Sequence, residues 1–295
     1  SISSISSISS LSSISSLSRN TISPLVVNGR LTLDDRLMVG GRHQTPWWNG
    51  RVRYSAIDKA TYALTRFIPG MEGRGMTDRV DSVVAEMNKT NTLVFAQNYG
   101  LWYDRRRDDH ERVRRIDGDV WAPFYEQPFA RSGQGTAWDG LSRYDLTRLN
   151  KWYYARLNEY AEKAAPEGKL LWNEHYFQHN ILEAGAHWVD CPWRPVNNVN
   201  LPVTAAQGET PFPEPVPFDG DKRVFMAEQF YNEQDPLLRP LHRQYIRMCL
   251  DQLKERPNVI HSISAEYTGP LHFTRFWLET IAEWEAETGC KPLIA

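Results

Sequence analysis

The sequence predicts an α/β domain built on a parallel sheet. Short β-branched or aliphatic segments alternate with longer amphipathic segments, which is typical of βαβ units. Several apolar segments end abruptly in polar and aromatic residues, and a parallel barrel carries its chemistry at such strand ends. A doubly wound sheet would compete, but the chain has no glycine-rich nucleotide-binding loop. We therefore predict a (β/α)8 TIM-type barrel.

Composition fits one large domain and limits the partners. The chain has 295 residues, of which 41% are hydrophobic and 12% aromatic, and a net charge of −2. It lacks the basic field that binds nucleic acids, and it has no apolar run of the roughly 18 residues that a membrane helix needs. Cys191, Cys249 and Cys290 form neither a disulfide framework nor a metal motif. We expect no cofactor, and the oligomeric state stays open.

The first 18 residues differ from the rest of the chain. Serine alternates there with Ile or Leu at every third position, a period that gives neither a helix nor a strand a stable apolar face. We predict a low-complexity tail at residues 1–18 and a barrel domain at residues 25–295. The chain shows no signal peptide, and we expect a secreted or periplasmic protein.

The elements follow from periodicity and turn signals. Thr77 is expected to cap a helix, and residues 117–140 are expected to form a functional loop. Ser142 and Asp145 are expected to make a capping box for a second helix, which ends near Pro166. Residues 223–230 fit a strand or a loop. Further helices are expected near 237–253 and 271–288. The expected strands are Arg36–Gly40, Tyr62–Ile68, Thr92–Ala96, Leu170–Glu174, Val259–Glu266 and Lys291–Ala295.

Two expected strands end in glutamate, which points to paired-carboxylate chemistry. Glu174 closes one strand and Glu266 closes another. Retaining glycoside hydrolysis needs a protonated carboxyl and an ionised carboxylate about 5–5.5 Å apart. We predict Glu174 as acid/base and Glu266 as nucleophile, with Asn173 bonding the sugar 2-hydroxyl. Glu228 is an alternative carboxylate, and ion-paired structural roles remain the competing interpretation for each glutamate.

Three stretches carry a resemblance to a known family. Residues Asn98–His110, Tyr176–Trp188 and Ser264–Pro270 resemble those of a poorly characterised family of bacterial TIM-barrel proteins similar to glycoside hydrolases. The resemblance covers most of residues 30–295. It implies the barrel fold, and it leaves the substrate open because that family has no settled activity.

Asn173-Glu174 also resembles the Asn-Glu pair that ends the fourth strand of clan A retaining glycosidases. In that clan a second glutamate ends the seventh strand, whereas Glu266 falls on about the sixth strand that we expect here. The clan pattern would place a further strand and helix after Ala295. The chain is therefore expected to be a fragment or to close in an unusual way.

Aromatic and polar residues at strand ends are the candidate sugar contacts, because indole faces stack on sugar rings while polar groups bond the hydroxyls. The candidates are Arg42, His43, Trp47, Asn98, Tyr99, Trp102, Asn173, His175, Tyr176, His179, His187, Trp188, Glu228 and Tyr267. Each has core or loop packing as the alternative.

The function predicted is hydrolysis of a glycosidic bond in a poly- or oligosaccharide. A non-catalytic carbohydrate-binding barrel is the first alternative. A metal-dependent hydrolase is the second, since His175 and His179 are four residues apart and Asp190 offers oxygen, although the His-Glu-x-x-His motif is absent.

Overall fold

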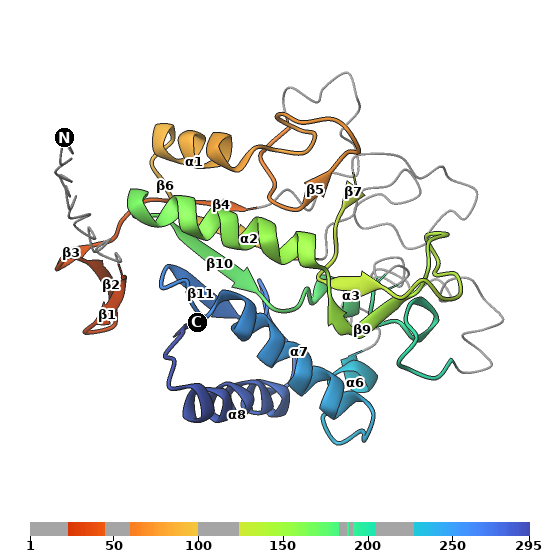
Figure 1. Ribbon diagram of the computed structural model, residues 1–295. Helices are drawn as coiled ribbons and strands as arrows, with labels where there is room; N and C mark the ends of the chain where they lie inside the picture. The colour runs from red at the N-terminus through yellow and green to blue at the C-terminus, as the bar shows by residue number, and fades with distance from the viewer. Residues whose placement is uncertain (1–22, 45–59, 100–123, 183–187, 189–190, 204–226) are drawn as a thin grey trace, which may run out of the picture.

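A parallel sheet of five strands forms the centre of the molecule. The computed structural model describes residues 23–44, 60–99, 124–182, 188, 191–203 and 227–295 (Figure 1). Its sheet has the order β12-β11-β10-β6-β4, and every neighbouring pair is parallel. The strands are β4 (Gly41–Gln44), β6 (Thr92–Gln97), β10 (Leu170–Glu174), β11 (Val259–Ser262) and β12 (Leu293–Ile294).

The order of strands in space follows their order in the chain. Each new parallel strand is added on the same side of the previous one, without the reversal that defines a doubly wound sheet. This is the order of strands in the wall of a barrel. Within the described residues the sheet has two free edges, at β4 and β12, and does not close. The predicted α/β class and parallel sheet are confirmed, whereas closure into eight strands stays a prediction.

Four helices connect the successive strands and cover one face of the sheet (Figure 1). Phe95, Leu171 and Val259 are register neighbours on adjacent strands, and all three belong to the apolar core that the helices complete. The helices are α1 (Val80–Lys89), α2 (Lys151–Ala164), α7 (Leu238–Leu253) and α8 (Leu271–Thr288). Because side chains alternate along a strand, Trp172 and Glu174 point to the opposite face.

Short elements surround this core. They are β1 (Leu25–Val27), β2 (Arg30–Leu33) and β3 (Arg36–Leu37) in one antiparallel sheet, the pairs β5 (Arg66–Phe67) with β7 (Phe124–Tyr125) and β8 (Phe129–Arg131) with β9 (Tyr144–Leu149), the helices α3 (His179–Leu182) and α6 (Ala227–Phe230), and the 3-10 turns Ala165–Glu167 and Pro195–Asn197. The chain of residues 1–18 lies outside the described residues.

Three predicted elements are corrected. The strand expected at Arg36–Gly40 is the antiparallel β3, and the first parallel strand begins at Gly41, directly after the expected strand. Only Arg66–Phe67 of the expected strand Tyr62–Ile68 pairs with a neighbour. The segment for which strand or loop was expected contains helix α6 instead.

The capping box is also wrong. Ser142 and Asp145 do not begin a helix, because residues 144–149 form β9 and pair with β8. Helix α2 begins later, and its N-cap is Asn150, whose side chain accepts hydrogen bonds from the backbone N–H groups of Trp152 and Tyr153. No helix in the described part of the chain combines the length and apolar character needed to cross a bilayer.

Candidate active site

Glu174 lies at the carboxyl end of β10, in the middle of the sheet. The strand begins with two fully buried leucines, Leu170 and Leu171, which fix its depth in the molecule. In the parallel ladder Glu174 stands beside Ser262, the last residue of β11. The apolar strand β10 therefore places a carboxyl group at the carboxyl end of the sheet, where parallel sheets carry their functional residues.

The surroundings of Glu174 favour its protonated form. The residue is 1% exposed, and its Oε2 atom has no hydrogen-bond partner within the described residues. Burial raises the pKa of Glu174 to about 7, which outweighs the opposite effects of the Ala265 backbone N–H and of Arg42, and the charge of Glu266 raises it further. A carboxyl group with this pKa gives and takes protons near neutral pH.

Among the described residues, Arg42 is the one cation that forms an ion pair with Glu174. Its Nη2 atom lies 3.4 Å from Oε1 of Glu174, and 47% of the arginine side chain is exposed. The guanidinium group also lies over Trp172, 5.8 Å from the ring centroid, and the Trp172 indole N–H donates to Ser262 Oγ at 2.7 Å. Arg42, Trp172 and Glu174 thus form a connected group on the face of the sheet away from the helices.

Glu266 follows β11 instead of ending it. The strand ends at Ser262, so Glu266 lies 266 − 262 = 4 residues beyond it, in a turn. Its side chain is 70% exposed, with Oε2 3.5 Å from Nε2 of His179. Its backbone has a φ of 49°, a left-handed conformation that costs energy for a residue with a side chain. The predicted position at a strand end is therefore wrong, although the charge of Glu266 still adds to the rise in the pKa of Glu174.

Gln178 holds the Glu266 turn and was not predicted as a site residue. Its amide N–H donates to the Glu266 carbonyl, and its Oε1 accepts from the backbone N–H of Thr268 at 2.7 Å. Ser264 Oγ accepts in turn from the Gln178 backbone N–H. Both strand-end segments are thereby tied together, and the strained turn is kept in place.

Two buried amides beside Glu174 lack partners. Asn98 is fully buried at the end of β6, and neither of its amide atoms has a hydrogen bond among the described residues. Nδ2 of Asn173, 2% exposed on β10, is likewise unsatisfied. Gln97 and Asn173 are register partners, so Asn98 and Glu174 are the next residues along two adjacent strands. Buried polar groups normally have hydrogen-bond partners, which ordered water or a bound polar molecule can also supply.

Comparison with known proteins places the chain in a family. The profile described as "Domain of unknown function (DUF6298)" matches residues 2–295. The chain belongs to this family. No curated protein matches it.

Two solved structures show a distant similarity to this member of the DUF6298 family. One is titled "Glycoside hydrolase", with 10% identity and a TM-score of 0.38 over 93% of this chain and 40% of that chain. The other is a glycoside hydrolase family 5 protein from Bacteroides vulgatus ATCC 8482, also with 10% identity and a TM-score of 0.38, over 92% of this chain and 38% of that chain. The chain spans about two fifths of the length of these structures.

In the DUF6298 chain, three predicted sugar contacts lie in the core. Tyr99, His175 and Tyr176 are each at most 1% exposed. The Tyr176 hydroxyl bonds Nδ1 of His242 at 3.0 Å, and His175 lies between His261 and Trp277. Their side chains pack on the helix side of the sheet, against Tyr245 of α7 and Trp277 of α8, and support the strand end from there.

The remaining predicted contacts are more scattered. His43 packs against Phe95 with tilted rings and bonds the Tyr62 carbonyl at 2.8 Å, and burial lowers its pKa. Trp188 is buried against Phe230, and Tyr267 packs beside Tyr231. Glu228 lies in α6, where its side chain is not described, and Trp47, Trp102 and His187 lie outside the described residues.

The metal hypothesis gains no support from the described histidines. Both ring nitrogens of His175 are engaged, one by His261 at 2.9 Å and one by the Trp277 indole at 3.1 Å. His179 lies beside Glu266, and Asp190 is not described. Within the described segments, no three His, Cys, Asp or Glu side chains converge in a way that suits a metal ion.

Proposed function

We propose that the protein hydrolyses glycosidic bonds, with Glu174 as acid/base and Glu266 as nucleophile. The observation that carries the proposal is the buried Glu174 carboxyl, whose pKa is raised to about 7 and whose Oε2 has no partner among the described residues. A glycosidase needs a carboxylic acid of this kind to protonate the leaving oxygen. The unsatisfied amide of Asn98, next to Glu174 on the neighbouring strand, offers hydrogen bonds to sugar hydroxyls, and the role of Asn173 toward the 2-hydroxyl is carried over from the Asn-Glu resemblance.

The proposed reaction has two steps. Glu174 gives its proton to the glycosidic oxygen while a Glu266 oxygen attacks the anomeric carbon, which releases the leaving sugar and forms a glycosyl ester on Glu266. Glu174, now ionised, takes a proton from water, and the hydroxyl oxygen displaces Glu266 from the anomeric carbon. Both glutamates return to their first protonation states. The exposed Arg42 is placed to contact substrate as well as Glu174.

The proposal extends to the fold and to the place of action. The five-stranded sheet is taken as the wall of a TIM-type barrel, because its strand order is sequential and each connection carries a helix. The resemblance of Asn173-Glu174 to the clan A pair agrees with the acid/base role. A poly- or oligosaccharide substrate too large to cross a membrane would require a secreted or periplasmic enzyme.

A panel of poly- and oligosaccharides tests the proposal with the full chain. Wild-type protein should release reducing ends from at least one glycan, and Glu174→Gln should slow that release by about 10²–10⁴-fold, since a general acid contributes that much. Glu266→Gln should be similarly impaired. Glu279→Gln on the exposed side of α8 is the matched control and should keep full activity.

Two results would change the conclusion. Full activity in both Glu174→Gln and Glu266→Gln, with unchanged circular dichroism, would remove the pair from catalysis. Glycan binding that neither substitution affects, without hydrolysis by the wild type, would identify a non-catalytic carbohydrate-binding barrel instead.

A further inference from the structure

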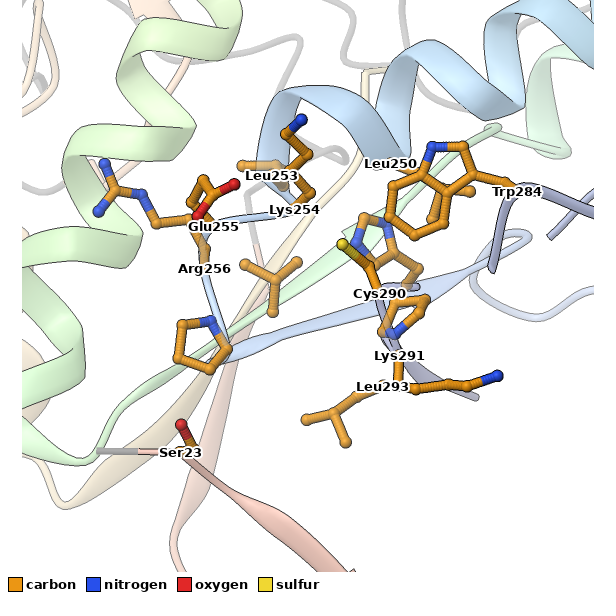
Figure 2. Close-up of a pocket in the computed structure, with 14 residues that line it drawn as sticks. Ser23, Leu250, Leu253, Lys254, Glu255, Arg256, Trp284, Cys290, Lys291 and Leu293 are labelled. Carbon is orange, nitrogen blue, oxygen red and sulfur yellow. The ribbon is translucent and has the colours of Figure 1, made fainter. Parts of the chain in front are cut away.

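A pocket lies at the opposite end of β11 from Glu174. It has a volume of about 290 Å³ and opens where α7 and α8 end, against Val259, the first residue of β11 (Figure 2). This volume is at the lower end of the range of ligand pockets, roughly 300–1,000 Å³. The pocket is separate from the proposed active site, which lies at the carboxyl end of the same strand.

One side of the pocket wall is apolar. Leu250 and Leu253 come from α7 and Trp284 from α8, and Figure 2 shows these side chains along the upper side of the pocket. The Trp284 indole N–H is already bonded to Asp251 at 2.8 Å, so the ring presents only its apolar surface. Such a wall fits the hydrocarbon part of a small molecule.

His261 supplies a hydrogen-bond donor whose direction is fixed by its neighbours. An indole N–H can only donate, so the bond from Trp277 makes Nδ1 of His175 an acceptor. The proton of neutral His175 is then on Nε2, which donates to Nδ1 of His261. His261 is 2% exposed, and burial lowers its pKa to about 4, so it is neutral with its proton on Nε2. His261 lines the pocket, and Nε2–H has no partner among the described residues.

Among the described residues, one cation of the pocket is left to bind an anion. Three cations, Lys254, Arg256 and Lys291, line the pocket together with one acid, Glu255. Arg256 is bonded to Glu162 and Lys291 to Glu285, whereas Lys254 makes no ion pair within the described part of the chain. The Lys254 ammonium is therefore available to a ligand.

We propose that this pocket binds a small amphipathic carboxylate. Its hydrocarbon part packs on Leu253 and Trp284, and its carboxylate accepts from His261 Nε2–H and pairs with Lys254. A ligand that carries an ammonium group is rejected, because the fixed tautomer offers it a donor and Lys254 offers it a like charge.

Cys290 provides a direct measurement of occupancy. It lines the pocket, and Figure 2 shows its sulfur directed toward the middle of the lining residues. Cys191 and Cys249 are buried, whereas Cys290 is partly exposed, so iodoacetamide should alkylate Cys290 selectively. The rate of alkylation, followed by peptide mass spectrometry, then reports whether the pocket is filled.

The probe is hexanoate, with hexylamine as its matched opposite in charge. Hexanoate at saturation should slow Cys290 alkylation about tenfold, and hexylamine should leave the rate unchanged, since His261 Nε2–H cannot accept from an ammonium group and Lys254 repels it. Lys254→Gln should raise the hexanoate concentration for half protection by roughly two- to fivefold, the effect of one exposed ion pair. Lys89→Gln, at the exposed end of α1, should change nothing.

Three outcomes would overturn the proposal: no protection by hexanoate, equal protection by hexylamine, or an unchanged half-protection concentration in Lys254→Gln. The measurement does not depend on glycoside hydrolysis, so its result leaves the proposed activity to its own test.

Discussion

Glu174 is held in the folded protein at a cost in stability. Its pKa is about 7 when folded and near 4.5 when unfolded. The folded state therefore binds the Glu174 proton more tightly than the unfolded state does. The stabilisation that comes from this protonation is fully present below pH 4.5 and is lost as the pH rises through 7. Above pH 7 the protein keeps an ionised carboxylate buried at the strand end, with Arg42 as its ion-pair partner.

Replacing this carboxyl by an amide should stabilise the protein. At pH 8, Glu174→Gln should raise the free energy of unfolding by roughly 2–3 kcal/mol, because a shift of one pKa unit corresponds to about 1.4 kcal/mol. At pH 4.5 the two proteins should be equally stable. Urea denaturation at both pH values measures the difference, and equal stability at pH 8 would mean that Glu174 has an ordinary pKa.

The sequence locates some site residues and misplaces others. Glu174 could be found because an apolar segment ends abruptly in a carboxyl group, and Arg42 because it stands in a polar-aromatic segment. Gln178 gave no signal, since its role depends on the backbone of a turn far along the chain. Glu266 was assigned to a strand end because Ile260–Ile263 continues the β-branched pattern, and no glycine marks the left-handed residue of the turn.

At the scale of elements, one helix was expected from Ser142 to about Pro166, whereas the structure has strand β9 followed by helix α2. Leu146, Leu149 and Tyr153 have helical spacing, but the first two belong to β9 and the third to α2. Strand pairing with β8 decides the conformation of residues 144–149, and pairing is not visible in local periodicity. The boundary at Asn150 is set by its side-chain cap.

Two alanine substitutions distinguish these boundaries. Asn150→Ala should lower the free energy of unfolding by about 1–2 kcal/mol, since it removes the two hydrogen bonds that cap α2. Ser142→Ala should cost less than Asn150→Ala, since the Ser142 side chain accepts one hydrogen bond, from the Gly133 backbone N–H at 3.2 Å. Thermal unfolding of both variants gives the comparison, and a reversed ranking would restore the predicted capping box.

For the whole molecule, alternation of strands and helices was sufficient to predict the parallel sheet. Each βα unit is local in sequence, so its order and direction can be inferred from periodicity and the right-handed crossover rule. The antiparallel sheet β1-β2-β3 was missed although the sequence signals it, because Asn28-Gly29 is a typical hairpin turn, with positive φ at both residues, and Arg30–Leu33 alternates polar and apolar residues. Closure of a barrel depends on pairing between distant strands, which the sequence pattern does not specify.

The buried histidines should make the fold sensitive to acid. Burial lowers the pKa of His242 and His261 to about 4 and that of His175 well below its usual 6.5. The unfolded chain then binds more protons, so stability is full above pH 6.5 and falls as the pH drops toward 4. Glu174 has the opposite effect over pH 4.5–7.

Between pH 7 and pH 5 the free energy of unfolding should fall by about 3 kcal/mol, because three histidines outweigh one carboxyl. The loss should be larger in Glu174→Gln, where the opposing group is absent. Urea denaturation at the two pH values tests this, and constant stability over the range would contradict the burial of these imidazoles.

The most direct test of the central claim is the titration of the Glu174 carboxyl by ¹³C NMR on glutamate-labelled protein. The structure leads to a transition near pH 7 that is absent in Glu174→Gln and moves to higher pH in Arg42→Gln, since Arg42 lowers this pKa. A midpoint near 4.5, the ordinary value for glutamate, would show that Glu174 is ionised at neutral pH and is not the acid of a glycosidase.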